Sequence, residues 1–158
     1  HRPLSLKLSK MNLKNINIIL ADDDPDDRML FNDAINDIDI ATNLSMFPDG
    51  QELMNYLLSD DVILPEIIFL DLNMPIKDGM ECLKEIRKTK GLEHLCVAIY
   101  STSSSEEDIE NTFVNGANIY INKPNSYKKL KVALKRVLQM NWQYHTSSLN
   151  MNNFLLRL

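Results

Sequence analysis

The chain has 158 residues, of which 44% are hydrophobic and 25% charged, and this composition suits a single domain with an ordinary core. Seventeen Lys and Arg against 22 Asp and Glu give a net charge of −5, which argues against nonspecific nucleic-acid binding. No apolar run approaches the roughly 18–20 residues of a membrane span, and the start of the chain lacks the apolar stretch of a secretory signal. We therefore expect a cytoplasmic protein with neither nucleic acid nor membrane as a partner.

The two ends of the chain differ from its middle. The sequence starts at His1, and Met11 is a candidate native start. We expect residues 1–14 to be an N-terminal arm or a cloning remnant, residues 15–145 to form one domain, and residues 146–158 to form a C-terminal tail. That tail closes on an apolar group, Phe154, Leu155, Leu156 and Leu158, which we expect to cover the protein's own surface or a partner's.

Five short apolar runs predict β-strands, because they are too short for helices and several are rich in Ile or Val. In chain order they are Ile16–Leu20, Asn43–Phe47, Glu66–Leu70, Cys96–Tyr100 and Asn118–Ile121. The two cysteines, Cys82 and Cys96, lack the spacing of a metal site. We expect reduced thiols, with one disulfide as the alternative.

Helical patterns follow each of these runs. Phe31, Ala34, Ile35 and Ile38 recur at i, i+3, i+4 and i+7, which predicts a helix with one apolar stripe. Four later stripes have the same character and are led by Leu53, Met80, Ile109 and Tyr127.

Start signals agree with the helical patterns. Asp24-Pro25 is typical of an N-cap followed by proline in the first turn. Asp49 with Glu52, and Ser104 with Glu107, indicate capping boxes or close variants. Five strand–helix units in strict alternation predict an α/β, doubly wound fold, in which a five-stranded parallel sheet carries helices on both faces.

Polar side chains follow four of the predicted strands. They are Asp22 and Asp23 after the first, Asp71 after the third, Ser101 after the fourth, and Lys123 after the fifth. Loops leaving the carboxyl ends of parallel strands form the functional edge of such a fold. The fold class therefore predicts three carboxylates, a hydroxyl and an ammonium along one edge.

These residues resemble the receiver domains of two-component response regulators, over roughly Ile16 to Leu138. The resemblance rests on the acidic pair, the strand-four hydroxyl, Lys123-Pro124, and the Asp-Leu-Asn-Met-Pro-x-x-Asp-Gly segment at Asp71–Gly79. Each piece alone is weak, but four in this order, each at a strand end, are highly specific. The run Asp22–Arg28 is similar to the stand-alone, single-domain branch of the family. The resemblance implies a flavodoxin-like sheet with strand order 2-1-3-4-5.

The resemblance also implies a chemistry. Asp71 is expected to accept a phosphoryl group as an aspartyl phosphate, with Mg²⁺ (or Mn²⁺) as the cofactor. Asp23, Asp71 and the backbone carbonyl of Asn73 would bind the metal directly, and Asp22 through a bound water. Three carboxylates balance a divalent ion and Lys123, so the resting site sums to zero. Since the acyl phosphate replaces −1 with about −2, Ser101 and Lys123 are expected to meet the excess by hydrogen bonds.

Further expectations follow from the same resemblance. Tyr120 resembles the family's switch aromatic, acting with Ser101, and its alternative interpretation is a partly buried strand tyrosine. The Lys123–Pro124 bond is expected to be cis, as is common at this place in the family. Two departures are Asn125, where phenylalanine is usual, and Thr102, where a smaller residue is common. We expect Thr102 to narrow the path to Asp71.

The remaining acids of the first loop have a plainer interpretation. Asp24, Asp26 and Asp27 are expected to cap the first helix and complement its dipole, at up to ~1 kcal/mol each. A calcium-binding EF-hand loop is disfavoured, because Pro25 interrupts the ligand spacing and no glutamate follows at position twelve.

The sequence supports one function above two others. We expect a receiver phosphorylated by a histidine kinase or a histidine phosphotransfer protein, acting on a downstream protein target by protein–protein contacts. It would promote both its own phosphorylation and its own dephosphorylation, the latter slowly, without being a turnover enzyme. A homodimer is a further expectation. One alternative is a haloacid-dehalogenase-type phosphatase, disfavoured by Asn73 in place of its second acid. The other is a phosphorylation-independent interaction module, disfavoured by the complete acid set.

Overall fold

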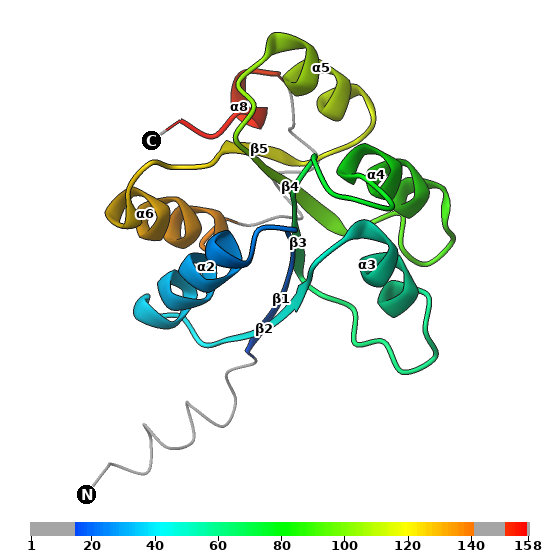
Figure 1. Ribbon diagram of the computed structural model, residues 1–158, viewed down its shortest axis with the longest axis horizontal. Helices are drawn as coiled ribbons and strands as arrows, with labels where there is room; N and C mark the ends of the chain where they lie inside the picture. Colours follow the sequence, from blue (N-terminus) through cyan, green and yellow to red (C-terminus); the bar gives the residue numbers. More distant parts are fainter. Residues whose placement is uncertain (1–14, 141–150, 158) are drawn as a thin grey trace, which may run out of the picture.

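The computed structural model describes residues 15–140 and 151–157, so the predictions for residues 1–14, 141–150 and 158 lie outside the described residues. Five strands form one parallel sheet in the order β2-β1-β3-β4-β5, as predicted (Figure 1). Their bounds are β1 Ile16–Ala21, β2 Thr42–Phe47, β3 Ile67–Leu70, β4 Cys96–Ser101 and β5 Ile119–Asn122. Three of them run one residue further at the carboxyl end than the apolar pattern indicated.

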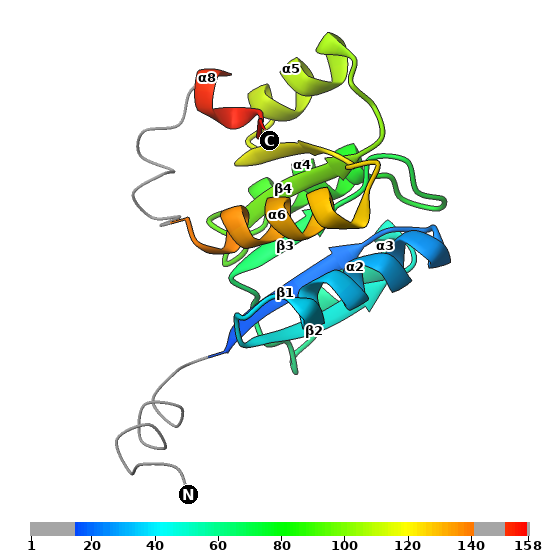
Figure 2. The ribbon, with the colours of Figure 1, turned by 90° about the vertical axis from the view of Figure 1, so that its left-hand side faces the viewer.

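Helices cover both faces of this sheet (Figures 1 and 2). They are α2 Pro25–Asp37, α3 Gly50–Leu57, α4 Gly79–Lys88, α5 Glu106–Val114, α6 Tyr127–Leu138 and α8 Met151–Phe154. Helices α2 and α6 share one apolar cluster with the sheet, while α3, α4 and α5 pack into the other. Because β3 and β4 are buried on both faces, β3 is apolar throughout and β4 is apolar up to its last residue, Ser101, without alternation. Among the described residues, no helix is both long and apolar enough to cross a bilayer.

Side chains close the first turn of each main helix. The carboxylates of Asp24 and Asp49 accept backbone hydrogen bonds as predicted. Helix α5 is capped by Ser105, whose hydroxyl accepts from the Asp108 N–H, so the prediction of Ser104 was wrong by one residue. A reciprocal capping box, which the sequence analysis missed, starts α4, where Asp78 and Glu81 exchange hydrogen bonds.

Both cysteines are buried free thiols, which confirms the first of the two expectations for them. Cys82 lies in the cluster under α4 and Cys96 in the cluster on the opposite face. Burial raises the pKa of each thiol to about 12, so both remain protonated at neutral pH.

The described end of the chain covers the edge strand β5. The Phe154 ring is fully buried, with its centroid 5.2 Å from that of Phe113 and 6.2 Å from that of Tyr120. The Leu156 N–H then donates to the Tyr120 carbonyl at 3.0 Å. This part of the apolar end covers the protein's own surface, which was one of the two alternatives, and the homodimer stays a prediction.

Candidate functional site

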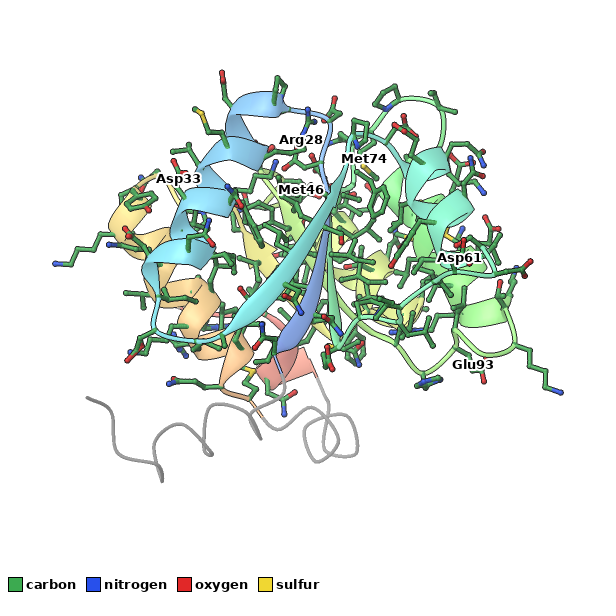
Figure 3. The ribbon with its side chains drawn as sticks, turned by 90° about the horizontal axis from the view of Figure 1, so that it is seen from below. Arg28, Asp33, Met46, Asp61, Met74 and Glu93 are labelled. Carbon is green, nitrogen blue, oxygen red and sulfur yellow. The ribbon has the colours of Figure 1, made fainter. Side chains whose placement is uncertain are left out.

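The parallel register brings the polar strand ends together. Ala21 pairs with Leu70, so the residues that follow β1 and β3 lie side by side, and the Asp71 N–H donates to the Ala21 carbonyl at 3.0 Å. On the other side, the Lys123 N–H donates to the Ser101 carbonyl at 2.7 Å. These backbone bonds fix the chain on which the site side chains stand. In Figure 3, Arg28 and Met74 mark this end of the sheet and Glu93 the opposite end.

Three carboxylates form a cluster at this edge. One oxygen from each of Asp22, Asp23 and Asp71 lies within 4.8 Å of the others. Asp22 is fully buried, Asp71 nearly so, and Asp23 is exposed. Carboxylate oxygens at this spacing, with one side open to solvent, are a donor set that a hard divalent cation prefers.

Asp22 is the acid whose surroundings most favour a further cation. Its Oδ2 atom is buried and accepts no aligned hydrogen bond among the described residues. The Lys123 ammonium nitrogen is 2.8 Å from that oxygen, so the contact is an ion pair without good hydrogen-bond alignment. A buried carboxylate oxygen in this condition is costly unless a cation compensates it, so the residues present fit a bound metal.

Lys123 is the centre of the charged network. Its Nζ atom lies 2.8 Å from Asp22 Oδ2, 2.8 Å from Asp27 Oδ2 and 3.3 Å from Asp71 Oδ2. Burial by itself lowers the pKa of Lys123, but its close contacts with the Asp22 and Asp27 carboxylates outweigh burial and raise the pKa overall. The ammonium also lies 5.2 Å from the centre of the Tyr100 ring. Lys123 is therefore a permanent cation at the mouth of the acid cluster.

The charged form of Asp71 is disfavoured by its surroundings. Burial raises the pKa of its carboxyl to about 6, Lys123 opposes the rise, and the nearby Asp22 charge adds to it. The Asn73 N–H lies 3.4 Å from Asp71 Oδ1, at the long end of hydrogen bonding. Without a second cation, Asp71 is a poorly compensated carboxylate at neutral pH.

This gives a prediction for the metal-free protein. At pH 7.5, Asp71→Asn is expected to raise the free energy of unfolding by on the order of 2 kcal/mol, because it removes a desolvated charge. The raised folded-state pKa means that the wild type gains stability as pH falls through about 6 toward 3.8, since the folded form then binds the proton more tightly. The advantage of the variant should therefore shrink by pH 5. Urea unfolding in a chelator at both pH values measures it.

The matched control for that experiment is Asp26→Asn, an exposed position in the first turn of α2, which should change stability by no more than about 1 kcal/mol at either pH. A stability difference between Asp71→Asn and wild type that does not vary with pH would contradict the account of Asp71.

Ser101 and Tyr120 lie beside the acid cluster. Ser101 is fully buried and its Oγ accepts from the Ser103 N–H at 3.1 Å. Tyr120 is also fully buried, more so than the alternative interpretation of a partly buried strand tyrosine, and its hydroxyl donates to the Ser103 carbonyl at 2.7 Å. Both residues thus meet at the backbone of Ser103. Their roles in a phosphoryl site and in a switch stay predictions.

Two further features of this edge are the Lys123–Pro124 bond and the unusual residues Thr102 and Asn125. The Lys123–Pro124 bond is trans, as are the other described peptide bonds, so the expected cis bond was wrong. Trans is the more stable form even before proline, and the turn is held by the Lys123 N–H bond to Ser101. Thr102 and Asn125 are both exposed.

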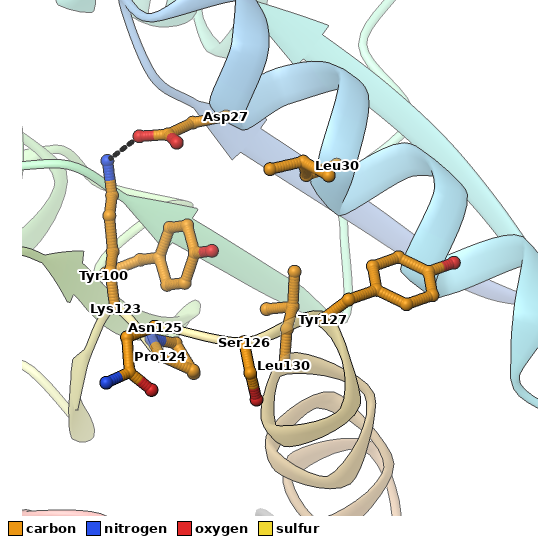
Figure 4. Close-up of a pocket in the computed structure, with 9 residues that line it drawn as sticks. All are labelled: Asp27, Leu30, Tyr100, Lys123, Pro124, Asn125, Ser126, Tyr127 and Leu130. Atoms are coloured by element: carbon orange, nitrogen blue, oxygen red, sulfur yellow. Dashed lines mark hydrogen bonds and ion pairs between the residues drawn. The ribbon is translucent and has the colours of Figure 1, made fainter.

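One member of the site, Asp27, was not predicted from the sequence. Asp27 was assigned to the helix dipole, but its carboxylate accepts a hydrogen bond from Lys123. Figure 4 shows this contact at the rim of a pocket of about 150 Å³ between the first turns of α2 and α6. The sequence did offer one indication: Asp27 lies in the first turn of a helix that begins two residues after the acidic pair Asp22 and Asp23.

Comparison with known proteins agrees with this geometry. The family model for the response regulator receiver domain matches residues 18–135, most of the chain. The chain belongs to this family. The receiver domain is 31% identical to response regulator Rcp1 of Synechocystis sp. over 117 residues, covering 72% of this chain and 80% of that protein. It is 29% identical to chemotaxis protein CheY-3 of Vibrio cholerae, covering 80% of this chain and 94% of that protein.

Solved structures show the same architecture. The Mn²⁺-bound form of Rcp1 is 28% identical to this receiver domain and superposes with a TM-score of 0.71, covering 77% of this chain and 91% of that one. The phosphorylated cyanobacterial phytochrome response regulator RcpA is 29% identical, with a TM-score of 0.74 and coverages of 87% and 98%.

Proposed function

We propose that this receiver domain accepts a phosphoryl group on Asp71 from a histidine kinase or a histidine phosphotransfer protein. The observation that carries the proposal is the Asp71 carboxylate itself, which is buried at the end of β3, clustered with Asp22 and Asp23 and 3.3 Å from the Lys123 ammonium. A carboxylate becomes a useful acceptor for phosphorus when fixed positive charge stands where the phosphoryl oxygens will lie.

The transfer step uses groups of this chain in defined roles. An Asp71 carboxylate oxygen attacks phosphorus and forms an O–P bond while the P–N bond to the donor's histidine breaks. The imidazole nitrogen keeps the electron pair and takes a proton from solvent. Lys123, 3.3 Å from Asp71 Oδ2, can donate an N–H to a phosphoryl oxygen, and the Ser101 hydroxyl is the second proposed donor.

The acid cluster supports a proposed Mg²⁺ cofactor. Asp22, Asp23 and Asp71 would hold the ion, together with the backbone carbonyl of Asn73. When bound, such an ion supplies positive charge to the phosphoryl oxygens. Support comes from the buried Asp22 Oδ2, which accepts no aligned hydrogen bond among the described residues, and from Rcp1, a relative whose structure is of a Mn²⁺-bound form.

The proposed output is a change in protein–protein contacts. Ser101 and Tyr120 meet at the Ser103 backbone, so a hydroxyl drawn toward the phosphoryl group would act on the strand that Phe154 covers. Phosphorylation would then shift a pre-existing equilibrium at the α5–β5 surface toward binding a downstream protein. The receiver would promote both its own phosphorylation and its own dephosphorylation, the latter slowly, without turning over a separate substrate.

The test is labelling by a small phosphodonor. With acetyl phosphate and Mg²⁺, the wild type should gain one phosphoryl group by intact mass, and the label should be released by hydroxylamine as an acyl phosphate. Asp71→Asn should gain none, while the exposed Asp26→Asn should label as the wild type does. An unlabelled wild type, or equal labelling of Asp71→Asn, would overturn the proposal.

A further inference from the structure

Asp27 reaches the site from a different element than the other acids. It stands in the first turn of α2, yet its Oδ2 lies 2.8 Å from Lys123 Nζ, closer than Asp71 Oδ2 at 3.3 Å. The contact joins residues 96 positions apart in the chain, and Figure 4 shows the two side chains meeting at the pocket rim. Asp27 is therefore a direct partner of Lys123 and not only a helix-dipole residue.

The Lys123 ammonium is already engaged by carboxylates in this arrangement. It donates hydrogen bonds to Asp27 and Asp71 and lies 2.8 Å from Asp22 Oδ2, and an ammonium has three N–H donors. A phosphoryl oxygen on Asp71 must therefore compete with these carboxylates for an N–H of Lys123. Asp22 belongs to the acid cluster that a divalent cation would compensate, but Asp27 does not. Asp27 is thus the acid that would still accept a hydrogen bond from Lys123 when a metal is bound.

Asp27 also changes the charge of the site. With Asp22, Asp23 and Asp71 alone, a divalent ion and Lys123 bring the resting site to zero. The fourth carboxylate brings it to −1, and the phosphoryl group would bring it to about −2. Asp27 and Asp71 share one ammonium nitrogen, so the added charge acts over a short distance in a partly buried place.

The local structure holds Asp27 in this position. Asp24 caps α2, and the Arg28 guanidinium donates to the Asp22 carbonyl at 2.7 Å, which ties the first turn of the helix to the end of β1. The Asp27 side chain is 31% exposed and faces a pocket of about 150 Å³. A neutral side chain of the same shape therefore fits there without repacking.

We propose that Asp27 is a positioning residue that holds Lys123 and, through its negative charge, limits how strongly the receiver retains a phosphoryl group. The inference rests on the proposed phosphorylation of Asp71. It assigns to Asp27 a regulatory effect on that site: the acid lowers the occupancy of the phosphorylated state.

The test compares Asp27→Asn with the wild type in two binding measurements. Beryllofluoride, a tetrahedral phosphoryl mimic, should bind Asp27→Asn about tenfold more tightly at saturating Mg²⁺, because one negative charge is gone and Lys123 is released. Mg²⁺ alone should bind the same variant more weakly. These opposite signs for an anion and a cation distinguish loss of charge from structural damage, which would weaken both.

Two further variants complete the experiment. Asp27→Glu restores the charge and should return beryllofluoride affinity toward the wild-type value, whereas Asp26→Asn should leave it unchanged. Equal or weaker beryllofluoride binding by Asp27→Asn, in a wild type that is labelled by acetyl phosphate, overturns this inference alone. A wild type that neither takes the label nor binds beryllofluoride overturns the proposed function as well.

Discussion

Gly79→Ala is expected to destabilise the domain by about 3 kcal/mol, although alanine is the better helix former. A Cβ at Gly79 would stand 2.1 Å from the Asp71 carbonyl oxygen and 2.8 Å from the Leu72 Cα, and both are backbone atoms that cannot turn aside. The helix-propensity gain is at most about 1 kcal/mol, so the clash decides the sign. The Gly79 N–H bond to the Leu72 carbonyl, 2.9 Å in the wild type, would be strained as well.

The same substitution should damage function beyond its effect on stability. Relief of the clash must move the Asp71–Leu72 backbone, and displacement of a reacting group by about 1 Å can cost a factor of ~100 in rate. Urea unfolding and the rate of labelling by acetyl phosphate, measured on the folded variant at low temperature, test both effects.

Gly91→Ala is the matched control. A Cβ there meets nothing within 4 Å, but the residue has a φ of +93°, so we expect a backbone cost of about 1–2 kcal/mol and normal labelling. A Gly79→Ala protein as stable as the wild type would show that the Asp71 segment yields more easily than its backbone contacts imply.

Lys123→Met is expected to cost the metal-free protein about 3–5 kcal/mol at pH 7.5, because it leaves buried carboxylates without their cation. Asp22 is fully buried and Asp71 nearly so, and both lie within 3.3 Å of the ammonium that would be lost. Loss of Lys123 also removes a cause that lowers the pKa of Asp71, so that pKa should rise above its wild-type value of about 6.

The pH dependence of this variant has a definite sign. A carboxyl whose folded-state pKa is raised favours folding when protonated, so Lys123→Met should regain stability as pH falls through the raised pKa of Asp71. Saturating Mg²⁺ should restore part of the loss at pH 7.5, and labelling by acetyl phosphate should fall at least ~100-fold. Urea unfolding at pH 7.5 and 5.5, with chelator or Mg²⁺, measures the stability effects.

Lys131→Met provides the comparison, because its exposed ion pair with Asp37, at 3.6 Å, should contribute no more than about 0.5 kcal/mol. If Lys123→Met and Lys131→Met lost the same small stability, Lys123 would not be compensating the buried acids.

Most of the fold could be predicted because apolar runs and helical stripes are patterns of neighbouring residues. The apolar runs around Ile18 and Ile68 are strands buried on both faces, and the Phe31 stripe is a helix face against them. The runs ended early at Ala21 and Ser101, where small or polar residues still pair within the sheet, because strand ends are set by the neighbouring strand and not by hydropathy.

The site followed from the sequence only as far as strand order allowed. Since the ends of parallel strands meet at one edge, polar residues after β1, β3, β4 and β5 had to lie near one another. Asp27 was not predicted because its role depends on a contact with Lys123, 96 residues away in the chain. In the local sequence nothing distinguishes it from Asp26. The burial of Phe154 against Tyr120 is equally long-range.

The sequence by itself therefore determined a five-stranded α/β receiver with Asp22, Asp23, Asp71 and Lys123 at one edge, because period and chain order carry that information. Only the tertiary structure decided how the charges are shared. It placed three carboxylates on one lysine, left Asp22 Oδ2 without an aligned donor, and set Gly79 against the Asp71 carbonyl. Such distances depend on how α2, β3 and β5 pack, and packing is a property of the whole chain.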